Sequence, residues 1–373
     1  MVANLVEEDE EALRSYLTEH LGERGSFSIE PFGGGNANET LALEWGDEVY
    51  ALRKPPVAEP APEVLHGLLR ECEVLSALEE TWVLAPDVVL ACEGESVIGD
   101  IFYVMERIEG DVLELAEPER FQTSEQRRRI GAETVDTLSK IHSIDVDRVG
   151  LSSFGDEETD YLTHQVEQLT AQLEWAQERT AESRELPVCF EVADWLADNV
   201  PESENHTLVH GDYKLDNIMF ASGTPARIAG VLDWEMSTLG DPLADLGWLL
   251  SYWTEERDPS PVTDDIEEEY SDHDYFPMLN VYAEEYSKFM RHEDYHSREE
   301  LVERYEKQTG FKYTNDRFYR ALGVFKLAAL CEGFYRMFLE DAPNTKESYP
   351  LMELMVPTLG HQAKQIIDDK TPL

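Results

Sequence analysis

The chain has 373 residues, more than a typical single domain of about 100–200 residues but suited to one two-lobed enzyme or two modest domains. Aspartate and glutamate (79 residues) outnumber lysine and arginine (30), which gives a net charge of −49 at pH 7. Because so negative a surface repels polyanions, we expect no nucleic-acid partner and no membrane partner.

The acidic residues are spread along the whole chain and are not gathered in one patch. A spread of this kind suits a cytoplasm at molar KCl, where a Debye length of about 3 Å screens the repulsion between like charges. The first residues carry neither the positive nor the apolar segment of a secretory signal. We therefore expect a halophilic, cytoplasmic protein, whereas a clustered charge would have favoured an acidic binding surface.

The first hundred residues predict a compact unit of mixed helix and strand. A polar helix is expected over residues 7–21, and strands are expected over residues 27–32, 40–45, 49–53, 87–92 and 101–105. Alternation along the third strand places Ala51 and Arg53 on one face. Between the third and fourth strands, apolar residues at helical spacing predict a helix whose buried face also carries Glu71.

The rest of the chain is expected to be mainly helical, including a buried helix over residues 318–338. Residues 208–233 are the exception, because short apolar runs surround polar residues there and predict two short strands with a working loop between them. The acidic, proline-containing residues 255–274 are expected to form a solvated surface loop.

That working loop carries the groups that phosphoryl transfer needs. One carboxylate must accept a hydroxyl proton, an amide oxygen and a carboxylate must hold Mg²⁺ against a triphosphate, and a cation must offset charge on the moving phosphoryl group. Asp212 fits the first role, Asn217 and Asp233 fit the second, and Lys214 fits the third.

The pattern H-G-D-x-x-x-x-N, followed by L-D-W-E and G-D-P-L-A-D-L-G, resembles the aminoglycoside phosphotransferase/choline kinase family of the protein-kinase-like fold. Within it, the chain looks like the kinase-like domain fused to acyl-CoA dehydrogenases, through residues 50–56, 70–71, 102–106 and 318–321. The resemblance spans about residues 32–337. It implies a two-lobed α+β fold with a small β-rich lobe and a larger, mainly helical lobe.

The resemblance also implies the domains and the site. Residues 1–108 would form the nucleotide-binding lobe, with a linker at about residues 104–110, and residues 109–373 would form the catalytic and substrate-binding lobe. Asp212 would be the catalytic base, with His210 bracing its loop. The metal ligands would be Asn217 and Asp233.

Nine residues would hold the nucleotide, so the expected cofactors are ATP and Mg²⁺. The phosphates would be contacted by Arg53, paired with Glu71, and covered by Gly34, Gly35 and Asn36. Adenine would be bound by the backbone of Glu106 and Ile108, between Ala51 and Met219.

The chain departs from the family pattern at two places. Arg53 stands where protein kinases have lysine, so ATP would be gripped by a bidentate fork with altered geometry. Trp234-Glu235 replaces the Phe-Gly pair after the metal aspartate, which argues against the switch of regulatory kinases.

We predict transfer of the γ-phosphoryl of Mg·ATP to a hydroxyl of a small molecule. No activation loop is evident between Asp233 and Asp241, which argues against a protein acceptor. Aromatic helices over about residues 161–179 and 282–338 are expected to build the acceptor pocket, for a hydroxylated acyl compound, an amino sugar or a choline-like alcohol. The oligomeric state is left open.

Two other hypotheses remain at this stage. A catalytically silent nucleotide-binding module is disfavoured by the intact set of Asp212, Asn217 and Asp233. A zinc hydrolase is raised by His292-Glu293-Asp294-Tyr295-His296, which matches H-E-x-x-H but lies in an acidic segment without a third histidine at metalloprotease spacing.

Overall fold

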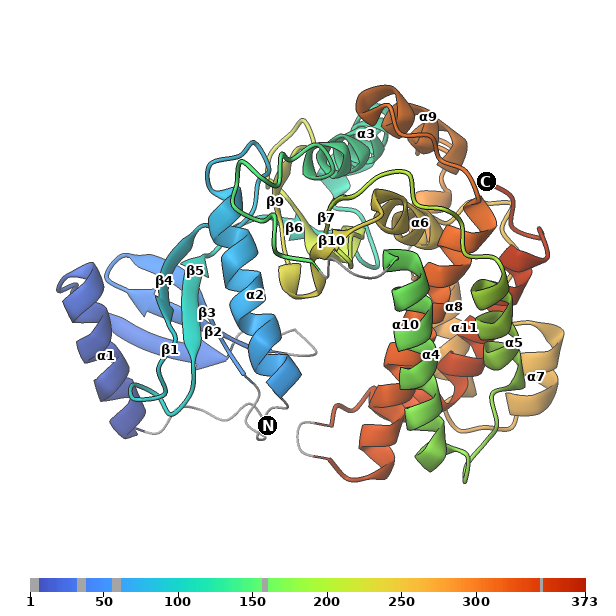
Figure 1. Cartoon of the computed structure of the whole chain (residues 1–373), viewed down its shortest axis with the longest axis horizontal. Helices are drawn as coiled ribbons and strands as arrows, with labels where there is room; N and C mark the ends of the chain where they lie inside the picture. Colours follow the sequence, from blue (N-terminus) through green and yellow to red (C-terminus); the bar gives the residue numbers. More distant parts are fainter. Residues whose placement is uncertain (1–6, 32–37, 56–61, 156–159, 287, 343–344) are drawn as a thin grey trace.

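A five-stranded antiparallel sheet forms the smaller lobe (Figure 1). The structure, a computed structural model, describes residues 7–31, 38–55, 62–155, 160–286, 288–342 and 345–373. The order of strands is β1-β2-β3-β5-β4. Their bounds are β1 Phe27–Pro31, β2 Glu39–Trp45, β3 Glu48–Lys54, β4 Val88–Cys92 and β5 Phe102–Glu106.

Two helices pack on the sheet, α1 (Glu7–Leu21) and α2 (Pro62–Leu78). Leu13 of α1 belongs to one apolar cluster with Leu52 of β3. Arg53, the next residue of β3, points to the other face and reaches Glu71 on α2. The alternation predicted for this strand is therefore confirmed, and it delivers a buried cation to the side of the sheet that faces α2.

The larger lobe is helical, and α10 (Asp316–Leu339) runs through its middle against α4, α6 and α11 (Figure 1). The other helices are α3 Ser124–Ile141, α4 Tyr161–Thr180, α5 Pro187–Asp198, α6 Pro242–Tyr252, α7 Asp264–Tyr270, α8 Phe276–Glu285, α9 Arg298–Thr309 and α11 Met352–Ile367. The buried helix predicted around residues 318–338 is thus confirmed as α10. Within the described ranges, no helix has the length and apolar character needed to cross a membrane.

Short strands lie in or overlap residues 208–233, the segment expected to hold the working loop, or pair with strands of that segment. They are β6 Asp111–Val112, β7 Thr207–Val209, β8 Ile218–Phe220, β9 Ile228–Val231 and β10 Thr238–Gly240. β8 pairs with both β6 and β9, and β7 pairs with β10. Residues 208–233 therefore contain three strands where two were expected, and the loop between β7 and β8 lies beside the end of β9.

The prediction of a solvated loop over residues 255–274 is wrong in part. Residues 264–270 form α7, whose Ile266 and Tyr270 are buried. The side chain of Thr263 caps this helix by accepting from the N–H of Ile266, and acidic residues in the first turn suit the positive end of the helix dipole. Acidity here stabilises a helix and does not mark a loop.

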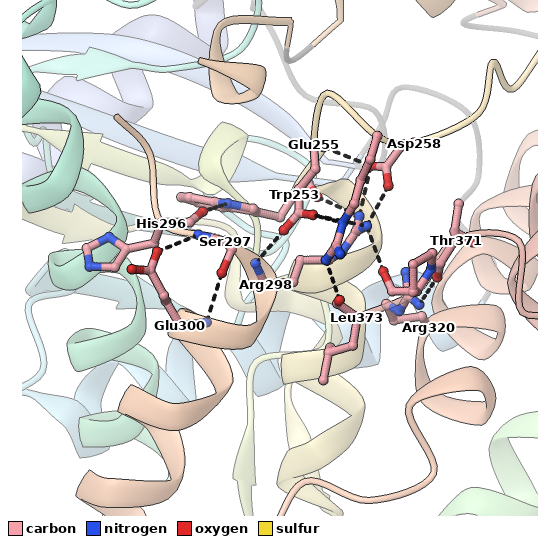
Figure 2. Close-up of polar contacts among 12 residues, drawn as sticks. Trp253, Glu255, Asp258, His296, Ser297, Arg298, Glu300, Arg320, Thr371 and Leu373 are labelled. Carbon is pink, nitrogen blue, oxygen red and sulfur yellow. Dashed lines mark hydrogen bonds and ion pairs between the residues drawn. The ribbon is translucent and has the colours of Figure 1, made fainter. Parts of the chain in front are cut away.

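The same segment carries two acidic residues that bind a buried arginine (Figure 2). Arg298, at 2% exposure, donates to Asp258 at 2.5 and 2.9 Å, and its backbone N–H donates to Glu255 at 2.7 Å. It also donates to the carbonyl oxygen of Pro372 at 2.9 Å. Arg298 therefore links the start of α9 to the segment after α6 and to residues near the C-terminus, and holds these three parts of the chain together.

Candidate active site

The loop after β7 is held by a carboxylate from α6. Asp245 accepts from the backbone N–H of His210 at 2.6 Å and of Gly211 at 2.8 Å. Gly211 has φ +82°, and a Cβ there would lie 2.4 Å from the carbonyl oxygen of Met236. Glycine is thus required at this position both by the backbone conformation and by the close approach of the backbone of Met236.

His210 braces the loop and does not face the cleft. It is fully buried, its Nδ1 accepts from the N–H of Asp212 at 3.1 Å, and its Nε2 lies 3.0 Å from the carbonyl oxygen of Leu232. With Nδ1 an acceptor, the proton sits on Nε2 and is donated to Leu232. Burial lowers the pKa of His210, so the imidazole is neutral, as this pair of contacts requires.

Asp212 and Asn217 lie at opposite ends of the same loop and are joined by their side chains. Nδ2 of Asn217 lies 2.8 Å from Oδ2 of Asp212 and 2.8 Å from its carbonyl oxygen. No hydrogen bond within the described ranges uses the amide oxygen of Asn217, so a hard cation can use it. Burial raises the pKa of Asp212 against the positive charges of Lys214 and Lys326, which makes its carboxylate a stronger base.

Asp233 follows β9 and lies beside the loop that carries Asp212 and Asn217. The N–H of Leu232 donates to the carbonyl oxygen of Asn217 at 2.8 Å, which sets the two segments side by side. Asp233 has φ +65°, a left-handed conformation that turns the chain sharply after the strand, and its side chain is 34% exposed. The structure thus brings together Asp212, Asn217 and Asp233, the three residues of the motif to which roles in base and metal chemistry were assigned.

A buried arginine, Arg53, faces three carboxylates, and Asp233 is one of them. Arg53 lies 2.6 Å from Glu71, 3.0 Å from Asp233 and 3.1 Å from Glu235. Burial raises the pKa of Glu71, and burial together with the charge of Asp233 raises the pKa of Glu235 to about 8. The cluster holds more negative than positive groups, so a cation or a protonated carboxyl must balance it.

Lys214, the predicted cation of the site, belongs to the same loop and lies between two carboxylates. Its Nζ is 3.9 Å from Asp212 and 3.4 Å from Asp216, and it lies 5.3 Å from the centre of the Tyr252 ring. Burial disfavours its charge, but Asp212 and Asp216 outweigh burial and raise its pKa. Lys214 is therefore a cation beside the carboxylate of Asp212.

The residues predicted to bind adenine lie on three strands and a linker. Ala51 is on β3, Met219 is on β8, and Glu106 ends β5. The N–H of Glu106 donates to the carbonyl oxygen of Asp87, whereas the N–H of Ile108 has no acceptor in the described part of the chain. Of these two linker N–H groups, that of Ile108 is the one left for a ligand.

The predicted phosphate-covering residues Gly34, Gly35 and Asn36 lie outside the described residues. Their neighbour Asn38 is described, and its Nδ2 donates to Glu235 at 2.9 Å. Glu235 was quoted in the L-D-W-E motif without a role, yet it is the third carboxylate on Arg53. The only signal in the sequence was its position two residues after Asp233.

The model of the phosphotransferase enzyme family matches residues 28–277, which include every residue of the site just described. The chain belongs to the phosphotransferase enzyme family. It is a small-molecule kinase-like enzyme, and its protein-kinase-like, two-lobed fold agrees with the prediction from the motifs.

Curated relatives of this phosphotransferase are larger proteins. Acyl-CoA dehydrogenase family member 11 of Homo sapiens is 30% identical over 360 residues, which are 94% of this chain and 42% of the relative. Acyl-CoA dehydrogenase family member 10 of Mus musculus is 31% identical over 353 residues, which are 93% of this chain and 30% of the relative. The chain therefore spans less than half of either relative, and the resemblance to kinase-like domains fused to acyl-CoA dehydrogenases is confirmed.

Solved structures agree on the fold. A crystallised protein of Ralstonia eutropha JMP134, provisionally described as an aminoglycoside phosphotransferase, matches with a TM-score of 0.72 and 26% identity over 96% of this chain and 98% of that one. A thermostable mutant of aminoglycoside phosphotransferase APH(4)-Ia, in complex with ADP and hygromycin B, matches with a TM-score of 0.55 and 13% identity over 97% of this chain and all of that one.

A cavity of about 120 Å³ lies in the helical lobe of this phosphotransferase, and no residue of the loop 210–217 is among those that line it. It lies among α6, α8, α10 and α11, and its aromatic residues are Tyr252, Tyr282 and Tyr286. The hydroxyl of Tyr286 donates to Asp216 at 2.6 Å, and the hydroxyl of Tyr252 is buried without a hydrogen-bond partner among the described residues. Of the two segments expected to build the acceptor pocket, residues 282–338 line this cavity and residues 161–179 do not.

The H-E-x-x-H segment does not form the helix that a zinc hydrolase needs. Residues 292–297 are turn and loop, and α9 begins at Arg298. The side chain of His292 is 45% exposed, whereas Tyr295 is buried and donates to Glu117 at 2.6 Å. No three His, Cys, Asp or Glu residues in the described ranges gather as a metal site, so this part of the chain offers zinc no such ligand set.

Proposed function

We propose that the protein transfers the γ-phosphoryl group of Mg·ATP to a hydroxyl of a small molecule. The observation that carries this proposal is the meeting of Asp212, Asn217 and Asp233, linked by the contacts from Asn217 to Asp212 and from Leu232 to Asn217. Asp212 would accept the hydroxyl proton as the acceptor oxygen attacks. Lys214 would offset negative charge on the transferred group.

Mg²⁺ suits the donors present. Asp233 supplies a partly exposed carboxylate and Asn217 an amide oxygen, which are hard oxygen ligands. Mg²⁺ commonly takes only one or two protein ligands and completes its shell with water and substrate phosphates. When bound, it would neutralise charge on the phosphates and on the excess of carboxylates around Arg53.

ATP is supported by the arrangement of Arg53 and the linker. Arg53 is fixed by Glu71 and points towards Asp233, so its guanidinium lies where phosphates bound to Mg²⁺ would come. The N–H of Ile108 in the linker is available for an adenine acceptor, and the adenine would lie between Ala51 and Met219. APH(4)-Ia, which shares the fold, was crystallised with ADP. The proposed lobes are residues 1–108 and 109–373.

The cavity of about 120 Å³, which is linked to the loop through the hydrogen bond from Tyr286 to Asp216, is the proposed acceptor site. Its described wall is mainly apolar and aromatic, and the carboxylate that lines it, Asp258, is already paired with Arg298. A cationic acceptor such as choline or an amino sugar is disfavoured by the three arginines of the lining, Arg291, Arg298 and Arg320, whereas an apolar chain needs only apolar surface. We therefore favour a hydroxylated acyl compound, in agreement with relatives named as acyl-CoA dehydrogenases.

The charge of −49 supports work in a cytoplasm at molar KCl, and the halophilic, cytoplasmic setting is part of this proposal. The deciding experiment is therefore carried out at molar KCl. The protein is incubated with γ-labelled ATP, Mg²⁺ and molar KCl over a pool of hydroxylated metabolites that includes hydroxyacyl thioesters, amino sugars and choline.

Label should move to a small molecule with the wild type and not with Asp233→Asn. Asp194→Asn, an exposed change on α5, is the matched control and should behave as the wild type. Nucleotide binding without transfer to any acceptor or to water would refute the proposal in favour of a silent nucleotide-binding module.

A further inference from the structure

A buried lysine from α10 reaches the catalytic loop. Lys326 is 9% exposed, and its Nζ donates to the carbonyl oxygen of Gly211 at 2.5 Å. The ammonium also lies 5.2 Å from the centre of the Trp248 ring on α6. Neither the motifs nor the family residues gave this side chain a role.

The position of Lys326 is energetically unfavourable for a cation. Burial lowers its pKa, and the charged groups that face it are Asp212, Asp245 and the like charge of Lys214. No ion pair in the described ranges joins Lys326 to a carboxylate within 4 Å. Because an unpaired buried ammonium costs free energy, a contribution to folding stability does not explain the residue.

The contact fixes one particular peptide unit. The carbonyl oxygen of Gly211 accepts from Lys326, and the N–H at the other end of the same peptide, that of Asp212, donates to His210 at 3.1 Å. The plane between Gly211 and Asp212 is therefore held at both ends. Its orientation sets the direction in which the side chain of Asp212 leaves the backbone.

We propose that Lys326 is a positioning residue for Asp212: it fixes the Gly211–Asp212 peptide from α10 and adds a positive charge beside the carboxylate. The inference rests on the proposed function, in which Asp212 accepts the proton. Val324 and Leu327, on the same helix, line the acceptor cavity. The same helix thus lines the acceptor cavity and carries the lysine that positions Asp212. The cavity and the base are therefore held in a fixed position relative to each other.

The test compares Lys326→Met, Lys326→Arg and the surface control Lys364→Met in the full chain. Steady-state transfer and ATP hydrolysis, in which water is the acceptor, are measured with nucleotide affinity and Tm. Lys326→Met should lower kcat roughly 100-fold, the loss expected when a catalytic group is misplaced by about 1 Å. Nucleotide Kd and KM for ATP should stay within about twofold of the wild type, and Tm should be unchanged or higher because a buried charge is removed.

Lys326→Arg should restore part of kcat, since it keeps a cation and donors near Gly211, and Lys364→Met should match the wild type. A wild-type kcat in Lys326→Met overturns the inference. So does a fall in kcat that accompanies an equal weakening of nucleotide binding and a lower Tm, which is the signature of a structural residue. A wild type that neither transfers phosphoryl nor hydrolyses ATP refutes the proposed function itself, and the inference with it.

Discussion

Nδ2 of Asn217 lies 2.8 Å from Oδ2 of Asp212, so the amide of one residue restrains the carboxylate of the other. The restraint leaves the amide oxygen of Asn217 for a cation and leaves Oδ1 of Asp212 on the side of Lys214, 3.9 Å away. The proposed base and the proposed metal ligand are therefore parts of one hydrogen-bonded unit.

Asp212→Asn should abolish most of the turnover and preserve nucleotide binding. The variant keeps the size of the side chain but loses the base, for which a loss of about 10²–10⁴-fold in kcat is expected. Asp212 makes no contact with Arg53, so the Kd for ATP measured by calorimetry should stay close to that of the wild type. An unchanged kcat would show that another group accepts the proton.

Removal of Arg53 should destabilise the fold strongly. Its side chain is 7% exposed and that of Glu71 is 1% exposed, so Arg53→Met leaves buried carboxylates without their cation. We expect a loss of about 3–5 kcal/mol in the free energy of unfolding, measured by urea at fixed KCl. Arg53→Lys should lose less because it keeps the charge; equal losses in the two variants would show that the guanidinium fork, and not its charge, is what matters.

Glu235 should make stability depend on pH. Burial and the charge of Asp233 raise its pKa to about 8, above the ordinary value of 4.5. Between these values the folded protein binds more protons than the unfolded chain, so the contribution of this group is present below pH 4.5 and is lost as the pH rises through 8. Without nucleotide or Mg²⁺, Glu235→Gln should be more stable than the wild type above pH 8, by about 1–3 kcal/mol.

The measurement is urea unfolding of both proteins at pH 5.5, 7 and 8.5. The difference between them should grow with pH. A difference that stays constant across this range would mean that Glu235 is already ionised at the lowest pH.

Tyr252→Phe should separate stability from acceptor binding. The hydroxyl of Tyr252 is buried without a partner among the described residues and lines the proposed acceptor cavity. Since no hydrogen bond is lost, Tm should not fall. If the hydroxyl binds the acceptor, KM for the acceptor should rise roughly tenfold, the equivalent of one hydrogen bond. Tyr305→Phe, which removes a hydroxyl paired with His142 away from that cavity, is the control and should lower Tm without changing KM.

Salt should stabilise the protein. With a net charge of −49, lowering KCl from about 1 M to 0.1 M lengthens the Debye length from about 3 to 10 Å and exposes the acidic residues to their mutual repulsion. The free energy of unfolding should fall by at least about 2 kcal/mol over this range. Stability that is the same at both concentrations would contradict the halophilic setting.

Patterns within a single strand, helix or loop predicted those site residues whose positions depend on that one element alone. Alternation along β3 put Arg53 on the inner face, the helical stripe of α2 put Glu71 there, and motif spacing identified Asp212, Asn217 and Asp233. Lys326 could not be found in this way, because it is 115 residues from Gly211 and meets it only through the packing of α10. Acidity also misled over residues 255–274, since composition does not reveal that Asp258 has a buried arginine as its partner.

Glu71 accepts from Arg53 and also from the backbone N–H of Trp234, at 3.2 Å. A single carboxylate on α2 thus holds both the strand that bears Arg53 and the segment that follows Asp233. Swinging α2 outward would break both contacts and leave Arg53 with two of its three carboxylates, Asp233 and Glu235. A displacement of α2 would therefore disturb the strand that bears Arg53 and the segment after Asp233 at the same time.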